Sequence, residues 1–442
     1  MGGRSDDVDR PSELTDGTSD AEPLVADVRS GDARANRRLS IVTIDQILSS
    51  VSNIGALIWV AHALAPGDFG RFGLIVMVYT VAVVTSRSLI STTAVVHPEE
   101  ADTHARRILA SAMMTGLVGG AVCVVAGLLL LYVGNSTFVG SVLALAIPLP
   151  LMVVQDVGRY LAIARREPGR ALVLDSLWIV LMAGAFVALA VLDGSTLTWL
   201  VLAWAGAGGI AGLWVFVQHG PPARGGFEWL REHWGFSWRS LVSGVTSSGI
   251  VLVMSALMAL FSSVLAVAAF RAATLLSAPS TAIQLAISTS AAADIARESE
   301  SEHAVWHHVR RAITITLGVG VLNLIILVFL PDWVGQAFLG ETWFVVEPLM
   351  LPVALKVLLM AGQSGLRAAL IGRRRITTTM VTDIVTMVLI CICMVAGAAI
   401  GDVEGAMWAM VPAMVLSTAC WWIAMAWKGR NPAPEKAEPV VP

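Results

Sequence analysis

The sequence predicts an all-α integral membrane protein with twelve transmembrane helices, arranged as two pseudo-symmetric six-helix bundles. Three observations predict this fold: the composition, the spacing of the charged residues, and an internal repeat. Of the 442 residues, 56% are hydrophobic and only 14% are charged, and the mean hydropathy is +0.75. Because a soluble domain carries about 25% charged residues, this composition excludes a soluble enzyme, a nucleic-acid binder and a fibrous protein.

Both ends of the chain are polar and are predicted to be disordered cytoplasmic tails. Residues 1–37 combine nine acidic residues with Ser, Gly and Arg, and a segment of this kind cannot bury enough apolar surface to fold. The segment also lacks the apolar stretch of a cleavable signal peptide. Residues 429–442 form a second, shorter tail that is rich in Pro, Lys and Glu.

Twelve apolar stretches between the tails are each long enough to cross about 30 Å of hydrocarbon as a helix. Helix is expected because backbone groups in lipid must form their hydrogen bonds within the segment. The first bundle, residues 38–218, contains the stretches 40–64, 70–92, 108–132, 139–163, 170–192 and 197–218. The second bundle, residues 238–428, contains the stretches 238–261, 264–291, 310–331, 346–371, 376–399 and 403–427.

Residues 219–237 join the bundles and are predicted to form an interfacial helix on the cytoplasmic side. Phe227, Leu230 and Trp234 share one face of this linker at helical spacing, and such a face lies in the lipid interface. The linker is not expected to be a binding site.

The basic residues set the orientation of the predicted helices. Of the 29 Lys and Arg residues, 26 fall on the side that also carries both tails, and only Arg71 falls on the opposite side. Since basic loops stay in the cytoplasm, both termini are expected to be cytoplasmic. We therefore expect a multi-pass protein of the cytoplasmic (inner) membrane.

An internal repeat relates the two bundles. Residues 147–175 align without gaps on residues 355–383, and Gln155, Arg159 and Asp175 then fall on identical residues. Two further windows agree, with offsets of 194, 204 and 208 in chain order. Convergence of Arg at cytoplasmic helix ends is the alternative, but it does not account for the Gln and Asp matches. The two copies of the repeat are separated by six helices, an even number, so both have the same orientation in the membrane. We therefore expect a pseudo-two-fold axis along the membrane normal, as in transporters.

Residues 45–73 resemble the opening of polysaccharide exporters in the MOP superfamily. In these exporters a first helix rich in Ser and Asn ends in a short outer turn. The corresponding turn residues here are Pro66, Gly67, Asp68, Phe69 and Gly70. The resemblance extends over residues 38–427, and it implies a Wzx-like O-antigen or teichoic-acid exporter that flips lipid-linked oligosaccharides. The related MATE multidrug transporters share the twelve helices and the repeat.

Two cations inside predicted helices are the leading site candidates. Lys356 lies about ten residues into its helix and Arg271 about seven, and an ionisable group at such a depth is a functional hypothesis by default. Snorkelling to the outer interface is the alternative, and it is easier for Arg271 than for Lys356. We expect both to offset the charge of a phosphate-bearing headgroup.

Further charged residues lie near the cytoplasmic ends of helices. Asp45 has no obvious partner and is expected to line an inner vestibule, and Arg87 is a further candidate for the cavity. Asp156 and Arg159 are i,i+3 neighbours that we expect to pair. Asp175 and its repeat equivalent are expected to pair with nearby Arg residues.

Hydroxyl and amide side chains gather on the first helix of each bundle. They either pack helices together or line a polar cavity for sugar hydroxyls. The cavity candidates among them are Ser49, Ser52, Asn53, Ser243, Thr246 and Ser247.

The function expected from these features is translocation of a lipid-linked oligosaccharide by alternating access, for cell-surface polysaccharide biosynthesis. A MATE-like multidrug or organic-cation antiporter is the rival, although it would require acids rather than cations deep in the cavity. A non-transporting scaffold is a third class. We expect no enzyme activity, cofactor, metal ion or nucleic-acid partner, because the outer loops are short and there is no Walker motif. The expected partners are the lipid-linked glycan, membrane lipids, and the polymerase or glycosyltransferases of the same pathway.

Overall fold

The computed structural model describes residues 21–132, 136–261, 264–339 and 343–427, and its secondary structure within these ranges is entirely helical. The elements of the first half are α1 (Ala21–Ala63), α2 (Pro66–Ser86), the π-helical turn η1 (Arg87–Ser91), α3 (Thr92–Val96), α4 (Pro98–Thr103), α5 (Ala105–Tyr132), α6 (Ser136–Ala146), α7 (Leu149–Ala164), α8 (Pro168–Val191) and α9 (Leu197–His219). The linker contains α10 (Gly226–Glu232). The elements of the second half are α11 (Trp234–Phe261), α12 (Val264–Leu276), α13 (Ala278–Arg297), α14 (Glu302–Val328), α15 (Asp332–Leu339), α16 (Trp343–Val346), the 3-10 turn η3 (Glu347–Leu349), α17 (Met350–Gly372) and α18 (Ile376–Ala426).

The described residues include seven helical segments that are long and apolar enough to cross a membrane, and eight if α6 and α7 are counted as one span bent by 45°. Every one of the twelve predicted spans falls on one helix or on two or three consecutive helical elements. The all-α membrane fold predicted from the sequence is therefore confirmed.

The longest element, α18, is two predicted spans joined by a tight reversal. Gly401 and Asp402 have non-helical backbone angles, and φ of Asp402 is +54°. The two arms touch through glycine, because a Cβ built on Gly397 would lie 2.3 Å from the carbonyl oxygen of Gly405. Such close backbone approach between membrane helices is typical of small residues.

Two predicted spans are broken next to prolines. The span 139–163 bends between α6 and α7, where Pro148 precedes the first residue of α7. The span 264–291 is divided into α12 and α13, and Pro279 lies in the first turn of α13. Proline removes one backbone donor and clashes with the preceding turn, so both breaks have a local cause.

The first helix differs from the prediction at its start. It begins at Ala21, so residues 21–37, which we predicted to be disordered, are helical in the structure. Once the membrane-crossing part of a helix has formed, each added residue gains a hydrogen bond at a small entropic cost. The prediction for residues 1–20 and 429–442 falls outside the described residues.

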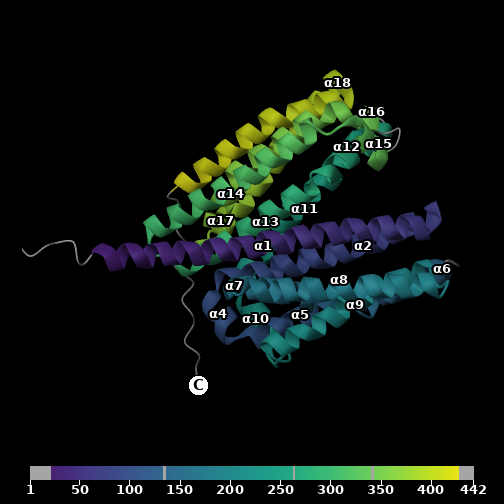
Figure 1. The fold of residues 1–442 in the computed structure, drawn as a ribbon, viewed down its shortest axis with the longest axis horizontal. Coiled ribbons are helices and arrows are strands. Elements are labelled where there is room, and N and C mark those ends of the chain that lie inside the picture. The colour runs from purple at the N-terminus through teal and green to yellow at the C-terminus, as the bar shows by residue number, and fades with distance from the viewer. Residues whose placement is uncertain (1–20, 133–135, 262–263, 340–342, 428–442) are drawn as a thin grey trace, which may run out of the picture.

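The helices of the two halves form two groups (Figure 1). The groups meet at the end of the molecule where α4, α7 and α13 lie, and they diverge toward α6 on one side and α16 on the other. The end where they meet also carries the basic turns after α7 and α17, which the charge distribution predicts to be cytoplasmic.

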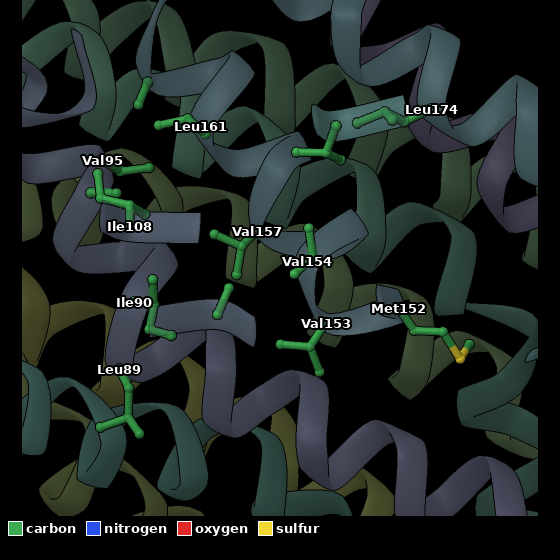
Figure 2. Close-up of a cluster of buried hydrophobic side chains, with 14 of the residues drawn as sticks. Leu89, Ile90, Val95, Ile108, Met152, Val153, Val154, Val157, Leu161 and Leu174 are labelled. Atoms are coloured by element: carbon green, nitrogen blue, oxygen red, sulfur yellow. The ribbon is translucent and has the colours of Figure 1, made fainter. Parts of the chain in front are cut away.

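The central helix of the first half is α7. Twelve of its residues are buried, among them the polar residues Gln155 and Asp156, so α7 lies in the interior of the first half. Val153, Val154 and Val157 of α7 lie among Ile90 and Ile108 of neighbouring elements (Figure 2). Polar residues on α7 are consequently held by a rigid, close-packed surrounding.

The linker helix is present but shorter than predicted. In α10 and at the start of α11, Phe227 and Trp234 are exposed, as expected for an interfacial face. Leu230, predicted to share that face, is half-buried and packs against the hydrophobic core instead. Trp229 is buried on the other side, where its Nε1 donates a hydrogen bond to Glu100. This contact fastens the linker to α4.

Candidate functional site

Arg159 is the centre of a buried ion-pair cluster in the first half. Its Nη2 lies 3.1 Å from Oδ2 of Asp45 and 3.0 Å from Oδ2 of Asp175. Gln155 Nε2 donates to the second oxygen of Asp175 at 3.0 Å. Both carboxylates are buried, and the Arg159 side chain is 12% exposed. The cluster joins α1, α7 and α8, because each of these helices supplies a charged group.

The prediction that Asp45 lacks a partner is wrong, since Arg159 is its partner. The two residues are 114 positions apart, and their pairing depends on how α1 packs against α7 and α8. Helical periodicity gives no information about that packing. The predicted pairing of Asp175 with a nearby Arg is confirmed, although the partner lies on the preceding helix rather than in the loop.

A second carboxylate of α7, Asp156, is held by Arg87. Nε of Arg87 lies 2.9 and 3.1 Å from the two carboxylate oxygens, and Nη2 lies 2.6 Å from Oδ1. This is a bidentate pair, the strongest geometry for a guanidinium group and a carboxylate. Arg159 Nη1 is 4.0 Å from Asp156, so the pair predicted between them is a secondary contact. The sequence did not reveal Arg87 as the main partner because the two residues lie on separate elements.

The predicted hydroxyl cluster of α1 lines a small pocket in the first half. Ser52 also donates to the carbonyl oxygen of Ser49 at 2.9 Å. The pocket is lined by Ser49, Ser52, Asn53, Asp175, Trp178, Ile179 and Met182. One wall is therefore polar and the other is aromatic and aliphatic.

The second half repeats the arrangement with a hydroxyl in place of one carboxylate. Arg367 Nη2 lies 3.3 Å from Oδ2 of Asp383 and 3.2 Å from Oγ of Ser243. Ser243 also donates a hydrogen bond to Asp383. Arg367 thus joins α11, α17 and α18, and Ser243 is a buried member of this cluster.

The other two hydroxyl candidates of the second half lie further along α11. Thr246 is half-buried and Ser247 is exposed. Ser247 donates to the carbonyl oxygen of Gly244 in its own helix at 3.2 Å. Neither residue takes part in the Arg367 cluster.

Lys356 lies on α17 on the same helical face as Gln363 and Arg367. It is half-buried, and it forms no ion pair or hydrogen bond with any residue in the described part of the chain. Gln363 donates to Thr418 Oγ1 of the second arm of α18 at 3.1 Å, whereas Arg367 binds Asp383 of the first arm. The other deep cation, Arg271, belongs to α12, but its side chain lies outside the described residues.

The two clusters differ in charge. The first half brings together two guanidinium groups and three carboxylates. The face of α17 carries Lys356 and Arg367 against the single carboxylate of Asp383. Among the described residues, no group of three or more His, Cys, Asp and Glu is placed to hold a metal ion.

Comparisons with known proteins agree with this architecture. Residues 59–348 match the family described as polysaccharide biosynthesis protein. No curated protein sequence matches the chain significantly.

Similar solved structures include a MATE transporter in complex with MaD3S, with a TM-score of 0.73 at 14% identity over 89% of this chain and 96% of that chain. A Vibrio cholerae MATE transporter has a TM-score of 0.71 at 13% identity, over 90% of this chain and 97% of that chain. A MOP superfamily transporter from Pyrococcus furiosus, described as having a binding pocket of reversed polarity, has a TM-score of 0.68 at 13% identity, over 89% of this chain and 95% of that chain. At these identities the similarity concerns the fold.

Proposed function

The chain belongs to the polysaccharide biosynthesis protein family, and from this premise we propose that it translocates a lipid-linked oligosaccharide across the cytoplasmic membrane. Family and fold make it a multi-pass membrane transporter with the fold of the MOP superfamily. The finer assignment needs a reason within the chain for an anionic, lipid-linked substrate.

Lys356 is the observation that carries the proposal. A cation without a partner inside a membrane helix is costly unless it faces water or meets an anion. All other cations of the two clusters have carboxylate partners: Arg87, Arg159 and Arg367. Lys356 has no such partner among the residues that the structure describes, and it is therefore available to offset the negative charge of a phosphate-bearing headgroup, for which an ammonium group is suited as a point charge.

The glycan and the lipid tail of such a substrate also have suitable surroundings in the fold. Hydroxyl and amide groups on α1 line the pocket of the first half, and they suit the hydroxyls of a glycan. The apolar outer faces of α5 and α8 meet lipid, where the polyprenyl tail would stay. Alternate opening of the two halves to either side would carry the headgroup across.

An organic-cation antiporter is the rival function. The pocket that contains Asp175 and Trp178 supports it, because a carboxylate and an aromatic face attract a cation. Asp175 is already paired with Arg159, however, so its charge is compensated. The Pyrococcus furiosus transporter with its reversed pocket polarity suggests that this fold admits substrates of different charge.

Flipping of a polyprenyl-diphosphate-linked oligosaccharide in proteoliposomes tests the proposal. We expect Lys356→Ala to lose at least 10-fold in rate and Lys356→Arg to keep part of it, because Arg retains the charge with a different geometry. Arg71→Ala is the matched control, since Arg71 is an exposed cation that pairs with Asp68 within one helix. Full flipping by folded Lys356→Ala, or transport of ethidium but not of the glycan by the unaltered protein, would overturn the proposal.

A further inference from the structure

Two arginines at the same position of the repeat lie in the turns at the cytoplasmic end. Arg166 follows α7 and Arg374 follows α17, and they align in the repeat. Their φ angles are +60° and +58°. Their backbone N–H groups donate to the carbonyl oxygens of Ile163 and Ile371, at 3.0 and 2.8 Å. A positive φ is unfavourable for a residue with a Cβ, and both copies of the turn adopt it.

Arg166 of the first half binds the second half. Its Nε lies 2.8 Å from Oδ1 of Asp294, and its Nη2 lies 2.6 Å from Oε1 of Glu298. Asp294 lies in the last turn of α13, and Glu298 directly follows the helix. The guanidinium fork is therefore filled by two acids of the other half.

Arg374 of the second half binds the first half in return. Its Nε donates to the carbonyl oxygen of Val96 at 3.0 Å, and its Nη2 lies 2.7 Å from Oε1 of Glu99. Val96 ends α3 and Glu99 lies in α4. In the order of the repeat, this segment of the first half corresponds to the end of α13 in the second half. The two contacts are thus reciprocal under the repeat.

A third arginine reinforces the junction from the second half. Arg297 binds Asp102 through two nitrogens, at 2.9 and 3.1 Å, and donates to the carbonyl oxygen of Ala164. The two halves are consequently held together at the cytoplasmic end by charged contacts from both sides. Any opening toward the cytoplasm has to break these contacts.

Breaking them exposes cations that need a new anion. The side chains of Arg166 and Arg374 are already 30% and 48% exposed, so a ligand from the cytoplasm can reach them. The planar fork of Arg matches phosphate as well as carboxylate. A diphosphate brings enough oxygens to bind two guanidinium groups at once.

We propose that Arg166 and Arg374 form a latch between the halves and, once released from their carboxylates, receive the phosphates of the substrate headgroup on the cytoplasmic side. The substrate thereby replaces the carboxylates that keep this end closed. This inference rests on the proposed function for the identity of the anion, while the latch itself does not depend on it.

Distances between spin labels in nanodiscs test the latch. Gly169→Cys in the first half and Glu300→Cys in the second are exposed positions near the junction, and the four native cysteines are replaced by Ala. We expect the triple variant Glu99→Gln, Asp294→Asn, Glu298→Gln to shift most of the population to longer distances. Glu302→Gln is the control, because Glu302 pairs with Arg373 inside the second half. An unchanged distribution in the triple variant would overturn the latch.

Binding of polyprenyl diphosphate tests the second step. The triple variant, with its arginines released, should bind polyprenyl diphosphate in nanodiscs at least as tightly as the unaltered protein. Arg166→Gln, Arg374→Gln should weaken binding at least 10-fold, although it also opens the junction, and Arg373→Gln should not weaken it. Equal binding by the double variant would overturn the role in substrate binding.

Inorganic pyrophosphate and phosphatidylglycerol, added in separate experiments, distinguish the source of the anion. The protein could bind pyrophosphate through Arg166 and Arg374 but not bind polyprenyl diphosphate. That result would overturn the proposed function, whereas the exchange of carboxylate for phosphate at the two arginines would still hold. Equally tight binding of phosphatidylglycerol would overturn selectivity for the substrate headgroup.

Discussion

Arg159 and Arg367 are equivalent residues of the two halves, and each bridges the same three helices of its own half. Arg159 joins α1 and α8 to α7 through two carboxylates, whereas Arg367 joins α11 and α18 to α17 through one carboxylate and a hydroxyl. The repeat seen in the sequence therefore includes the ion pairs that fasten the helices. The two halves differ in charge at the place where the first has Asp45.

This difference predicts unequal stability losses. Arg159→Met leaves two buried carboxylates without their cation and should cost about 3–5 kcal/mol. Arg367→Met leaves one carboxylate, Asp383, which still accepts a hydrogen bond from Ser243, and should cost about 1–2 kcal/mol. Thermal unfolding in detergent measures both.

Neutralising the unpaired carboxylates tests whether unpaired charge causes the loss of stability. Asp45→Asn and Asp175→Asn, added to Arg159→Met, should recover most of the loss because no carboxylate then remains unpaired. A triple variant no more stable than Arg159→Met alone would show that packing, rather than charge, sets the cost.

Close packing of α9 against α7 predicts a second asymmetry, between two glycines of the first half. A Cβ built on Gly212 lies 2.1 Å from the carbonyl oxygen of Leu151, whereas one on Gly184 meets nothing within 4 Å. Gly212→Ala has to displace backbone and should cost at least about 1–3 kcal/mol. Gly184→Ala should be neutral or slightly stabilising, because Ala favours helix. Equal melting temperatures of the two variants would contradict the close approach of α7 and α9.

Much of the fold could be predicted from the sequence. Apolar length located each span, and the alignment of Asp175 with Asp383 near arginines predicted that each pairs with an arginine, although the partners lie on the preceding helices rather than in the loops. These inferences succeed because hydropathy and short-range spacing are local properties. The breaks next to Pro148 and Pro279 are also local, but apolar length does not reveal them because both segments are long enough to span as single helices.

The partners that depend on packing between distant helices could not be predicted. Asp45 was expected to be free, and Asp156 was expected to pair mainly within its helix, yet Arg159 and Arg87 bind them from other elements. Arg166 and Arg374 are among the 26 basic residues that predict the orientation, and their spacing predicts no partner for them. Their identical place in the repeated turn was the available clue, and their contacts with the opposite half depend on how the halves meet.

The latch should open as the pH falls. Burial, reinforced by the charge of Arg374, lowers the pKa of His97 to about 4. His97 also contacts the ring of His233, which binds Glu100. Burial alone would raise the pKa of Glu298, but hydrogen bonds from His308 and Arg166 outweigh it and hold that pKa below its usual value.

Both shifts favour the closed junction at neutral pH. A depressed pKa stabilises the closed form above the usual pKa of the group, and this contribution is lost as the pH falls toward the depressed value. Opening removes Arg374 from His97 and Arg166 from Glu298, so the open form binds more protons. The spin-label distances should lengthen between about pH 6.5 and pH 4. His97→Gln should reduce the response, and shorter distances at low pH would contradict the assignment.

The orientation of the whole molecule gives the last prediction, because the latch acts on the cytoplasmic side only if the basic turns lie there. The linker is tied to the same end, since Arg106 Nε donates to the carbonyl oxygen of Pro221 at 2.8 Å and Trp229 binds Glu100. A reporter inserted next to Pro221, or fused after residue 442, should therefore be active in the cytoplasm. A fusion in the outer turn beside Asp193, between α8 and α9, is the control and should report the opposite side. Cytoplasmic activity at Asp193, or its absence at Pro221, would reverse the orientation and place the latch on the outer face.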